Sequence, residues 1–392
     1  MSHSTPDTLS ELGDTVSDDN EERLRIEASQ GGHITRFEFL EGGDWKRIPF
    51  RADEWGTSWY VRDRRGESCP VLMSCRPGTL NQFEGVHDDI RFGLSYVVAG
   101  GELLVTATLV NEGSKPFAPM TAGLRLGVDS YQTSYPEWND QLVPNVIRCE
   151  ASHHWGFAMS PGGMILGWAC GAAVASYSIN YEPREHRIYT PSIDFLNQSP
   201  LPEHHPQHLH SVGPGEARTW TVGVRPISSV EEIKPTLANA ADGPIFDAAR
   251  YTIAPEEEAR ISIFGPAIES LTVTSPNGSQ RVIHPTDQAV GRADYSFGSD
   301  CVGHHLFTAL TANGKRRKGA SLCAGLGFGI WSVLGLKDYG CDPPTLIMPK
   351  ACIHSLVIFS PENICRMPRW TANAKRFLAS VSPSILIVKS GN

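Results

Sequence analysis

The sequence predicts a mainly β protein: a large antiparallel sandwich, then a small one, then an irregular C-terminal tail. Many short segments alternate polar and apolar residues, as half-buried strands do. Gly and Pro are abundant, at 37 and 28 of 392 residues, and mark frequent turns. Hydrophobic residues make up 40% of the chain, which is enough to bury sizeable cores. These observations favour sheets packed on sheets.

Residues 23–226 contain many such segments, and the clearest hairpin lies at 91–113. Apolar residues alternate along both of its strands: Leu94, Tyr96 and Val98, then Leu103, Val105, Ala107 and Leu109. Gly100 and Gly101 separate the two runs and favour a tight turn. This spacing predicts a large antiparallel sheet system over 23–226.

The other regions differ in composition. Residues 1–22 are acidic and rich in Ser and Thr, which predicts a disordered tail. Residues 227–250 predict a helical linker, with Ser228 or Ser229 capping a short helix that Pro235 limits. Residues 251–320 return to short strands with turns every eight to twelve residues, a spacing that is typical of an Ig-like β-sandwich.

Residues 321–392 depart from this pattern, because they hold four of the nine cysteines and no clear periodicity. Translating the codons of 322–332 in a shifted frame can give L-R-x-P-W-x-W-Y-L-E, the aromatic start of an amphipathic helix. One hypothesis is therefore that the tail is a frameshifted start of a missing barrel. Degenerate codons fit many peptides, so an irregular native tail is the alternative.

Charge and targeting signals exclude several classes of function. The net charge of −9 disfavours a nucleic-acid partner, because an acidic surface repels phosphates. The sequence contains no run of eighteen apolar residues, so it predicts no membrane span. Without a secretory signal, nine cysteines are expected as free thiols in the cytoplasm. No motif calls for a cofactor.

Three segments carry a resemblance to a known family: residues 31–39, 96–119 and 209–224. The middle one combines a tyrosine-bearing strand and a glycine turn with Asn111-x-Gly113 and Lys115-Pro-Phe. The last holds Pro214-Gly-Glu before Trp220. In this order the first domain resembles the β-supersandwich of galactose-mutarotase-like proteins.

The second domain looks like the small Ig-like sandwich that follows in some polysaccharide-degrading enzymes. There a six-hairpin α/α barrel comes next and bears the catalytic acids. The resemblance implies a non-catalytic N-terminal portion of a glycoside hydrolase or polysaccharide lyase that shapes the cleft for an oligo- or polysaccharide. An apolar face meant for the barrel would be exposed, which favours self-association.

Two alternative functions remain open from the sequence. A stand-alone aldose epimerase-like enzyme is one, although residues 120–131 lack the histidine that the resemblance would require. A carbohydrate-binding or scaffold module is the other. Whether the chain is an enzyme is left undecided.

Aromatic and polar residues supply the candidate ligand-binding sites. Sugar rings stack on aromatic faces, and their hydroxyls bond to nearby polar groups. The candidates are Trp55, Trp59, His153, His154, Trp155, Tyr181 and Arg187. A place in the sandwich core or at its rim is the alternative for each.

Two further sets are weaker candidates. His186 and Glu182 could act as an acid–base pair in a mutarotase-like mechanism, or lie in a solvated loop. Clustered imidazoles can bind a metal ion, although an exposed polar strand entrance accounts for them equally simply. These histidines are His204, His205, His208 and His210.

Overall fold

The computed structural model describes residues 24–29, 31–48, 58–127, 130–131, 137–182, 187–202, 205–255, 257–312 and 316–323. Within these ranges the chain is almost entirely strand, with one α-helix and one short 3-10 helix, η1 (Glu137–Asp140). The predicted mainly β fold class is confirmed. The predicted acidic tail at 1–22 and nearly all of 321–392 lie outside the described residues.

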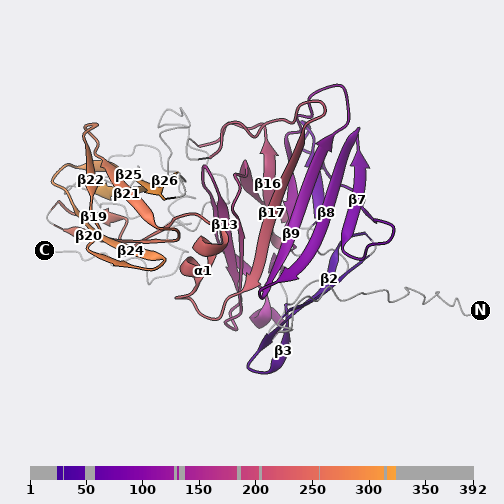
Figure 1. The fold of residues 1–392 in the computed structure, drawn as a ribbon, viewed down its shortest axis with the longest axis horizontal. Helices are drawn as coiled ribbons and strands as arrows, with labels where there is room; N and C mark the ends of the chain where they lie inside the picture. The colour runs from indigo at the N-terminus through magenta and orange to yellow at the C-terminus, as the bar shows by residue number, and fades with distance from the viewer. Residues whose placement is uncertain are drawn as a thin grey trace, which may run out of the picture.

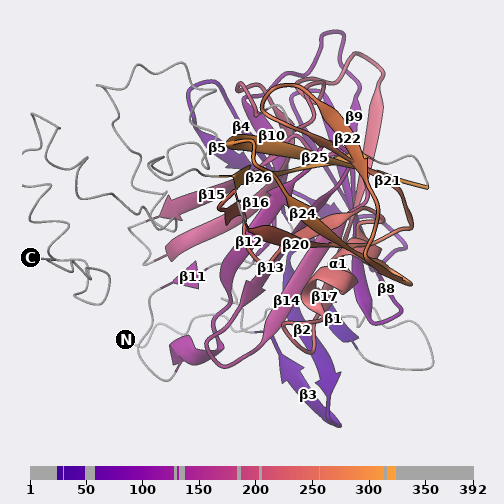
Figure 2. The same cartoon turned by 90° about the vertical axis from the view of Figure 1, so that its left-hand side faces the viewer.

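The large sandwich consists of two main sheets that face each other (Figures 1 and 2). The eight-stranded sheet runs in the order β12 (Val143–Cys149), β13 (His154–Met159), β14 (Ile165–Cys170), β17 (Ala217–Pro226), β9 (Glu102–Asn111), β8 (Ile90–Ala99), β7 (Gln82–His87), β6 (Ser74–Cys75). The six-stranded sheet runs in the order β11 (Ser130–Tyr131), β16 (Arg187–Asn197), β10 (Thr121–Arg125), β4 (Ser58–Arg62), β5 (Ser68–Pro70), and β15 (Ser176–Glu182) also pairs with β16.

A third, three-stranded sheet lies beside the main sheets: β1 (Leu24–Ala28), β2 (Ile34–Glu41) and β3 (Asp44–Arg47). All three sheets contribute to one continuous hydrophobic core. At its centre the Trp59 ring meets Phe92 and Phe195 edge to face, at centroid distances of 5.0 and 5.3 Å. Such aromatic contacts join the two main sheets.

The predicted hairpin is confirmed as β8 and β9, paired from Ile90 opposite Asn111 to Ala99 opposite Glu102. Its alternating apolar residues are buried, as their period of two requires. Gly100 and Gly101 have φ angles of 59° and 74°, and this left-handed geometry is the reason that the turn uses glycine.

The Asn111-x-Gly113 motif has a structural role. The fully buried Asn111 donates its side-chain amide to the carbonyls of Lys115 and Val212 and accepts a hydrogen bond from the Gly113 amide. This joins the end of β9 to the segment that leads into β17. There the Glu216 carboxylate accepts a hydrogen bond from the Gly213 amide. Both polar groups tie irregular backbone that the sheets cannot pair.

The small sandwich has a four-stranded and a five-stranded sheet. The first has the order β18 (Ile245–Ala248), β20 (Glu258–Phe264), β24 (Arg292–Gly298), β23 (Asp287–Ala289). The second has the order β19 (Thr252–Ile253), β26 (Arg316–Cys323), β25 (Gly303–Thr311), β21 (Ile268–Thr274), β22 (Gln280–Ile283). The first strand of this sandwich, β18, therefore lies within the predicted linker at 227–250. Its last strand, β26, continues three residues past the predicted end of the domain at 320.

Helix α1 (Ile233–Ala240) lies between the sandwiches and packs on β13 and β14 on one side and on β18 and β20 on the other (Figure 1). Its buried Ile233 and Leu237 join a cluster with Trp155 and Ile245. The cap prediction is wrong in position: Glu232, not a serine, is the N-cap residue. Pro235 lies in the first turn, where its missing N–H leaves no helical bond unmade.

Candidate functional site

The face of the six-stranded sheet that points away from the core carries polar side chains. In β4, Trp59 and Val61 enter the core, so Ser58 and Tyr60 lie on the opposite face. The register places further residues of β10, β16 and β15 on this same face. We call it the polar outer face, and it comprises Ser58, Tyr60, Arg62, Thr121, Arg125, Ser176, Ser178, Ser192 and Asp194.

Asp194 is the centre of a hydrogen-bond network on this face. Its fully buried carboxylate accepts hydrogen bonds from the Tyr60 hydroxyl and from Ser176 and Ser178, the latter two at 2.8 and 2.6 Å. Asn197 in turn donates to the Ser176 hydroxyl at 2.7 Å. Three strands, β4, β15 and β16, thereby share one polar cluster, and β4 is distant in the sequence from the other two.

Burial dominates the titration of this network. It raises the pKa of Asp194, and the hydrogen bonds from Ser178, Tyr60 and Ser176 only partly oppose this rise. The pKa of Tyr60 lies well above its usual value, first because of burial and then because of the Asp194 charge. Since both side chains are buried, the network stabilises the sheet and does not present a reactive group to a ligand.

Beside the network lies a cavity of about 260 Å³. One wall is apolar and comes from the segment after β5, with Val71, Leu72 and Met73. The other wall is polar and holds His33, Ser58 and Arg125. Gly31 and Pro70 complete the lining. The volume lies slightly below the roughly 300–1,000 Å³ of pockets for drug-sized ligands, so a small ligand or one ring of a longer one fits.

The sheet register positions the polar wall. Arg125 ends β10 and lies directly opposite Ser58 of β4 on one side and Ser192 of β16 on the other. Directly opposite residues project to the same face, so Arg125 has a serine on each side of it on the outer face. An apolar wall facing a few convergent polar groups is the usual make-up of a small-molecule site.

Two of the predicted ligand-binding residues, Trp59 and Trp155, lie in hydrophobic cores. Trp59 is fully buried, and its Nε1 donates to the Gly93 carbonyl at 3.0 Å. Trp155 is buried in the cluster around α1. Neither ring presents a face to solvent, because both lie where sheets or a helix cover them.

The two neighbouring histidines are buried as well. His154 Nε2 accepts a hydrogen bond from Trp168 Nε1 at 3.3 Å, and burial, together with the charge of His205, lowers the pKa of His154 to about 3. His153 lies under Gly243, where an added Cβ would come within 2.8 Å of the imidazole. These contacts account for both histidines through packing.

Several predicted residues are not placed in full. Trp55, His186 and His204 lie outside the described residues. Glu182 and Arg187 end β15 and begin β16 opposite each other, but their side chains, like that of Tyr181, are not among those described. Their roles stay predictions.

The described part of the chain holds no group of three or more histidine, cysteine or acidic residues that could bind a metal ion. His205 is buried, and its Nδ1 lies 2.9 Å from the Ala175 carbonyl oxygen. His208 and His210 are exposed. The predicted cluster therefore does not converge at the three described histidines.

Sequence reasoning missed the cavity. The alternation in Ser58–Arg62 was a usable signal, because period two separates Trp59 from Ser58 and Tyr60. No local pattern shows that β4, β10 and β16 are neighbours, since they are separated by long stretches of chain.

No family model and no curated protein matches the chain. Among solved structures it is similar to a polysaccharide lyase, with a TM-score of 0.57 and 14% identity over 78% of this chain and 47% of the lyase. A galactose mutarotase related enzyme from Lactobacillus acidophilus matches with a TM-score of 0.33 and 9% identity, covering 57% of this chain and all of that one. A putative aldose 1-epimerase from Escherichia coli K12 matches at 0.33 and 14%, covering 54% and 98%.

The likeness to the lyase shows a shared fold, and the two weaker matches carry no argument. The chain matches about half of the lyase's length. In the described residues, no helix is long and apolar enough to cross a membrane.

Proposed function

We propose that this chain is the non-catalytic N-terminal portion of a carbohydrate-active enzyme, of the glycoside hydrolase or polysaccharide lyase type. Its two sandwiches would pack on a catalytic domain and form one wall of the glycan cleft. The observation that carries the proposal is the fold match to a polysaccharide lyase over 78% of this chain and less than half of that one.

The arrangement of the described residues supports a binding role over a catalytic one. Asp194, the acidic group at the centre of the polar network, is buried among hydroxyl donors. The cavity beside it offers an apolar wall and hydroxyl and cationic groups, which suit the CH faces and hydroxyls of a sugar.

The packing of both sandwiches on helix α1 also supports the proposal that they form one continuous wall. Helix α1 shares a buried cluster with β13, β14 and β18, so both sandwiches bury apolar surface against the same helix. Burial of this kind opposes independent motion of the two parts. Self-association through an exposed apolar face stays a prediction.

The test combines binding and turnover on the purified full chain. We expect weak binding of oligosaccharides, on the order of millimolar because only one wall is present, seen as ligand line broadening in NMR. Neither chain cleavage nor faster anomer exchange should occur. Cleavage would contradict the non-catalytic role, and faster anomer exchange would favour an epimerase. Absence of any binding across a glycan array and in NMR would contradict a glycan-facing wall.

A matched pair of variants localises the binding. Leu72 lines the cavity and is 85% exposed, whereas Leu80 is 62% exposed and lies outside the lining. L72D should weaken oligosaccharide binding several-fold, because it places a carboxylate where apolar contact is needed. L80D should leave it unchanged, and equal effects of both would place the binding elsewhere.

A further inference from the structure

Within the described residues, Arg125 is a cation without a counter-charge. It lines the cavity and is half-buried, and among the described residues no hydrogen bond or ion pair to its guanidinium occurs. Asp194 lies on the same face, but the cation that lowers its pKa is Arg62. Water can hydrate the exposed part of this guanidinium, and a ligand oxyanion would add the charge-assisted hydrogen bonds that the described residues do not supply.

Two further polar atoms near Arg125 are unsatisfied. His33 Nδ1 in the cavity lining and Ser192 Oγ opposite Arg125 are buried and have no hydrogen-bond partner within the described ranges. Buried polar atoms are nearly always bonded in folded proteins. Ser58 adds a second hydroxyl on the other side of the guanidinium. Three polar side chains, those of His33, Ser58 and Arg125, thus line the same cavity, and Ser192 is the register neighbour of Arg125.

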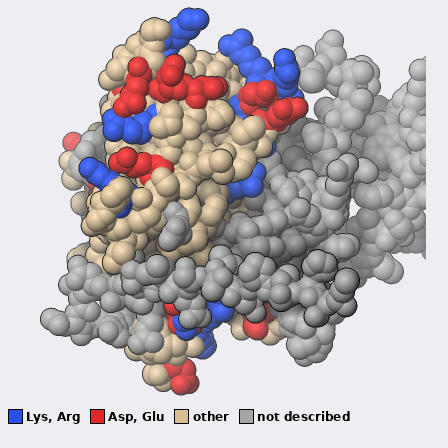
Figure 3. All heavy atoms as spheres, turned by 90° about the vertical axis from the view of Figure 1, so that its right-hand side faces the viewer, with Lys and Arg blue, Asp and Glu red and all other residues tan. Residues whose placement is uncertain are grey.

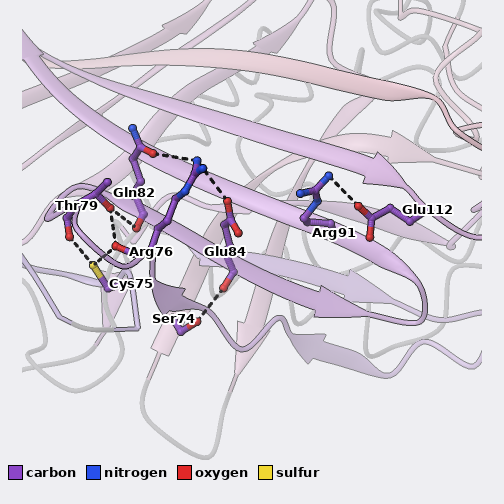
Figure 4. A network of polar contacts seen from close by, with 8 residues as sticks. All are labelled: Ser74, Cys75, Arg76, Thr79, Gln82, Glu84, Arg91 and Glu112. Carbon is purple, nitrogen blue, oxygen red and sulfur yellow. Dashed lines mark hydrogen bonds and ion pairs between the residues drawn. The ribbon is translucent and has the colours of Figure 1, made fainter.

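Two other arginines of this sandwich, Arg76 and Arg91, have acidic partners. On the outer side of β7 and β8, Arg91 pairs with Glu112 at 2.7 Å and Arg76 with Glu84 at 3.7 Å (Figure 4). Seen from the side of the molecule where β7 lies, basic and acidic side chains lie close together (Figure 3). Arg125 therefore differs from these two arginines, because no described acidic residue pairs with it.

We propose that the cavity is a binding site for a small oxyanion, a carboxylate or a phosphate. The Arg125 guanidinium pairs with two anion oxygens in a fork geometry, and the Ser58 hydroxyl and the His33 ring donate to the remaining lone pairs. The buried Val71 and the half-buried Met73 supply the apolar part of the lining beside this pairing. The site does not depend on the glycan proposal, because a free anion would satisfy it equally.

The test titrates the full chain with inorganic phosphate, glucuronate and glucose by calorimetry and NMR. Phosphate binding alone indicates a free anion as the source, and preference for glucuronate over phosphate indicates an acid on a sugar. Glucose, which has no charge, should bind at least about tenfold more weakly than the better anion, because charge-assisted hydrogen bonds are absent. Equal binding of all three, or of neither anion, would overturn the site.

Two variants and a control locate it. R125Q should weaken binding of the preferred anion at least about tenfold, and R125K should have an intermediate effect because it keeps the charge but loses the fork. R91Q removes a paired, exposed arginine of the other sheet and should leave binding unchanged. Equal weakening by R125Q and R91Q would mean non-specific attraction and would contradict the proposal. Should R125Q fail to fold, R125K against R91Q decides the same question.

Discussion

The two outer faces of the large sandwich differ in chemistry although they belong to the same architecture. On the part of the eight-stranded sheet that α1 does not cover, formed by β7, β8 and β9, the outer side chains are accessible, and polar groups pair with neighbours, as Thr106 does with Thr221 of β17 at 3.1 Å. On the six-stranded sheet the outer residues Tyr60 and Asp194 are buried and form a network. Strand alternation alone thus separates core from outer face but does not determine whether the outer face meets solvent.

Energetics should follow the same division. A charge on the accessible face is stabilised mainly by water, so losing its partner costs little. A polar group on the buried face depends on its protein partners, so losing one leaves the others unpaired. Substitutions that compare the two faces test this directly.

The largest effect is expected from D194A. It removes the acceptor of three hydroxyl groups, two of them buried and one half-buried, and should lower the free energy of unfolding by about 3 kcal/mol. Urea unfolding followed by tryptophan fluorescence measures this. A loss below about 1 kcal/mol would show that water reaches the network and that the face is not dry.

The next effect concerns acid stability and His154. Its pKa is lowered to about 3 in the folded protein, against an unfolded value near 6.5. Between these values the unfolded chain binds the extra proton, so stability falls as pH falls, by up to about 1.4 kcal/mol per pH unit. The free energy of unfolding should decrease less between pH 7 and pH 4 for H154Q than for the unaltered protein. An equal decrease in both would contradict the burial of a neutral imidazole.

Asp194 should make stability depend on pH in the opposite direction. Burial raises its pKa in the folded protein, so its contribution is fully present below the unfolded pKa near 3.9 and declines as pH rises through the folded pKa. The stability difference between the protein and D194N should therefore shrink as pH rises from about 4. A difference that grows with pH would mean that the hydroxyl donors outweigh burial.

The smallest effect is expected from E112A on the accessible face. Arg91 and Glu112 are 47% and 49% exposed, so their ion pair contributes at most about 1 kcal/mol and less at high salt. Unfolding in low and high salt measures it. A loss comparable to that of D194A would abolish the contrast between the two faces.

Parts of the fold were accessible from local patterns. The hairpin of β8 and β9 follows from alternating apolar residues and a Gly-Gly turn, which are both local. The Asn111-x-Gly113 motif is part of the family resemblance, and the Asn111 side chain donates a hydrogen bond to the Val212 carbonyl. The boundaries around α1 were less accurate, because the position of the helix depends on tertiary packing of Ile233 and Leu237.

The candidate site was largely beyond sequence reasoning. Trp59 and Trp155 fit a sugar platform as residue types, but the same rings also fit a core, and burial distinguishes the two. Arg125 carried no signal of its own, because it stands next to apolar residues in an ordinary strand. Its proposed role rests on the neighbouring strands, whose described residues give it no acidic partner.

The sequence by itself determined the class of structure and its strongest hairpin, because alternation and turn residues act over a few positions. Tertiary structure decided which strands became neighbours, which outer face was buried and where an unpaired arginine met a cavity. The cavity depends on residues from the segment before β2, from β4, from β10 and from the segment after β5, which only the closed sandwich brings together.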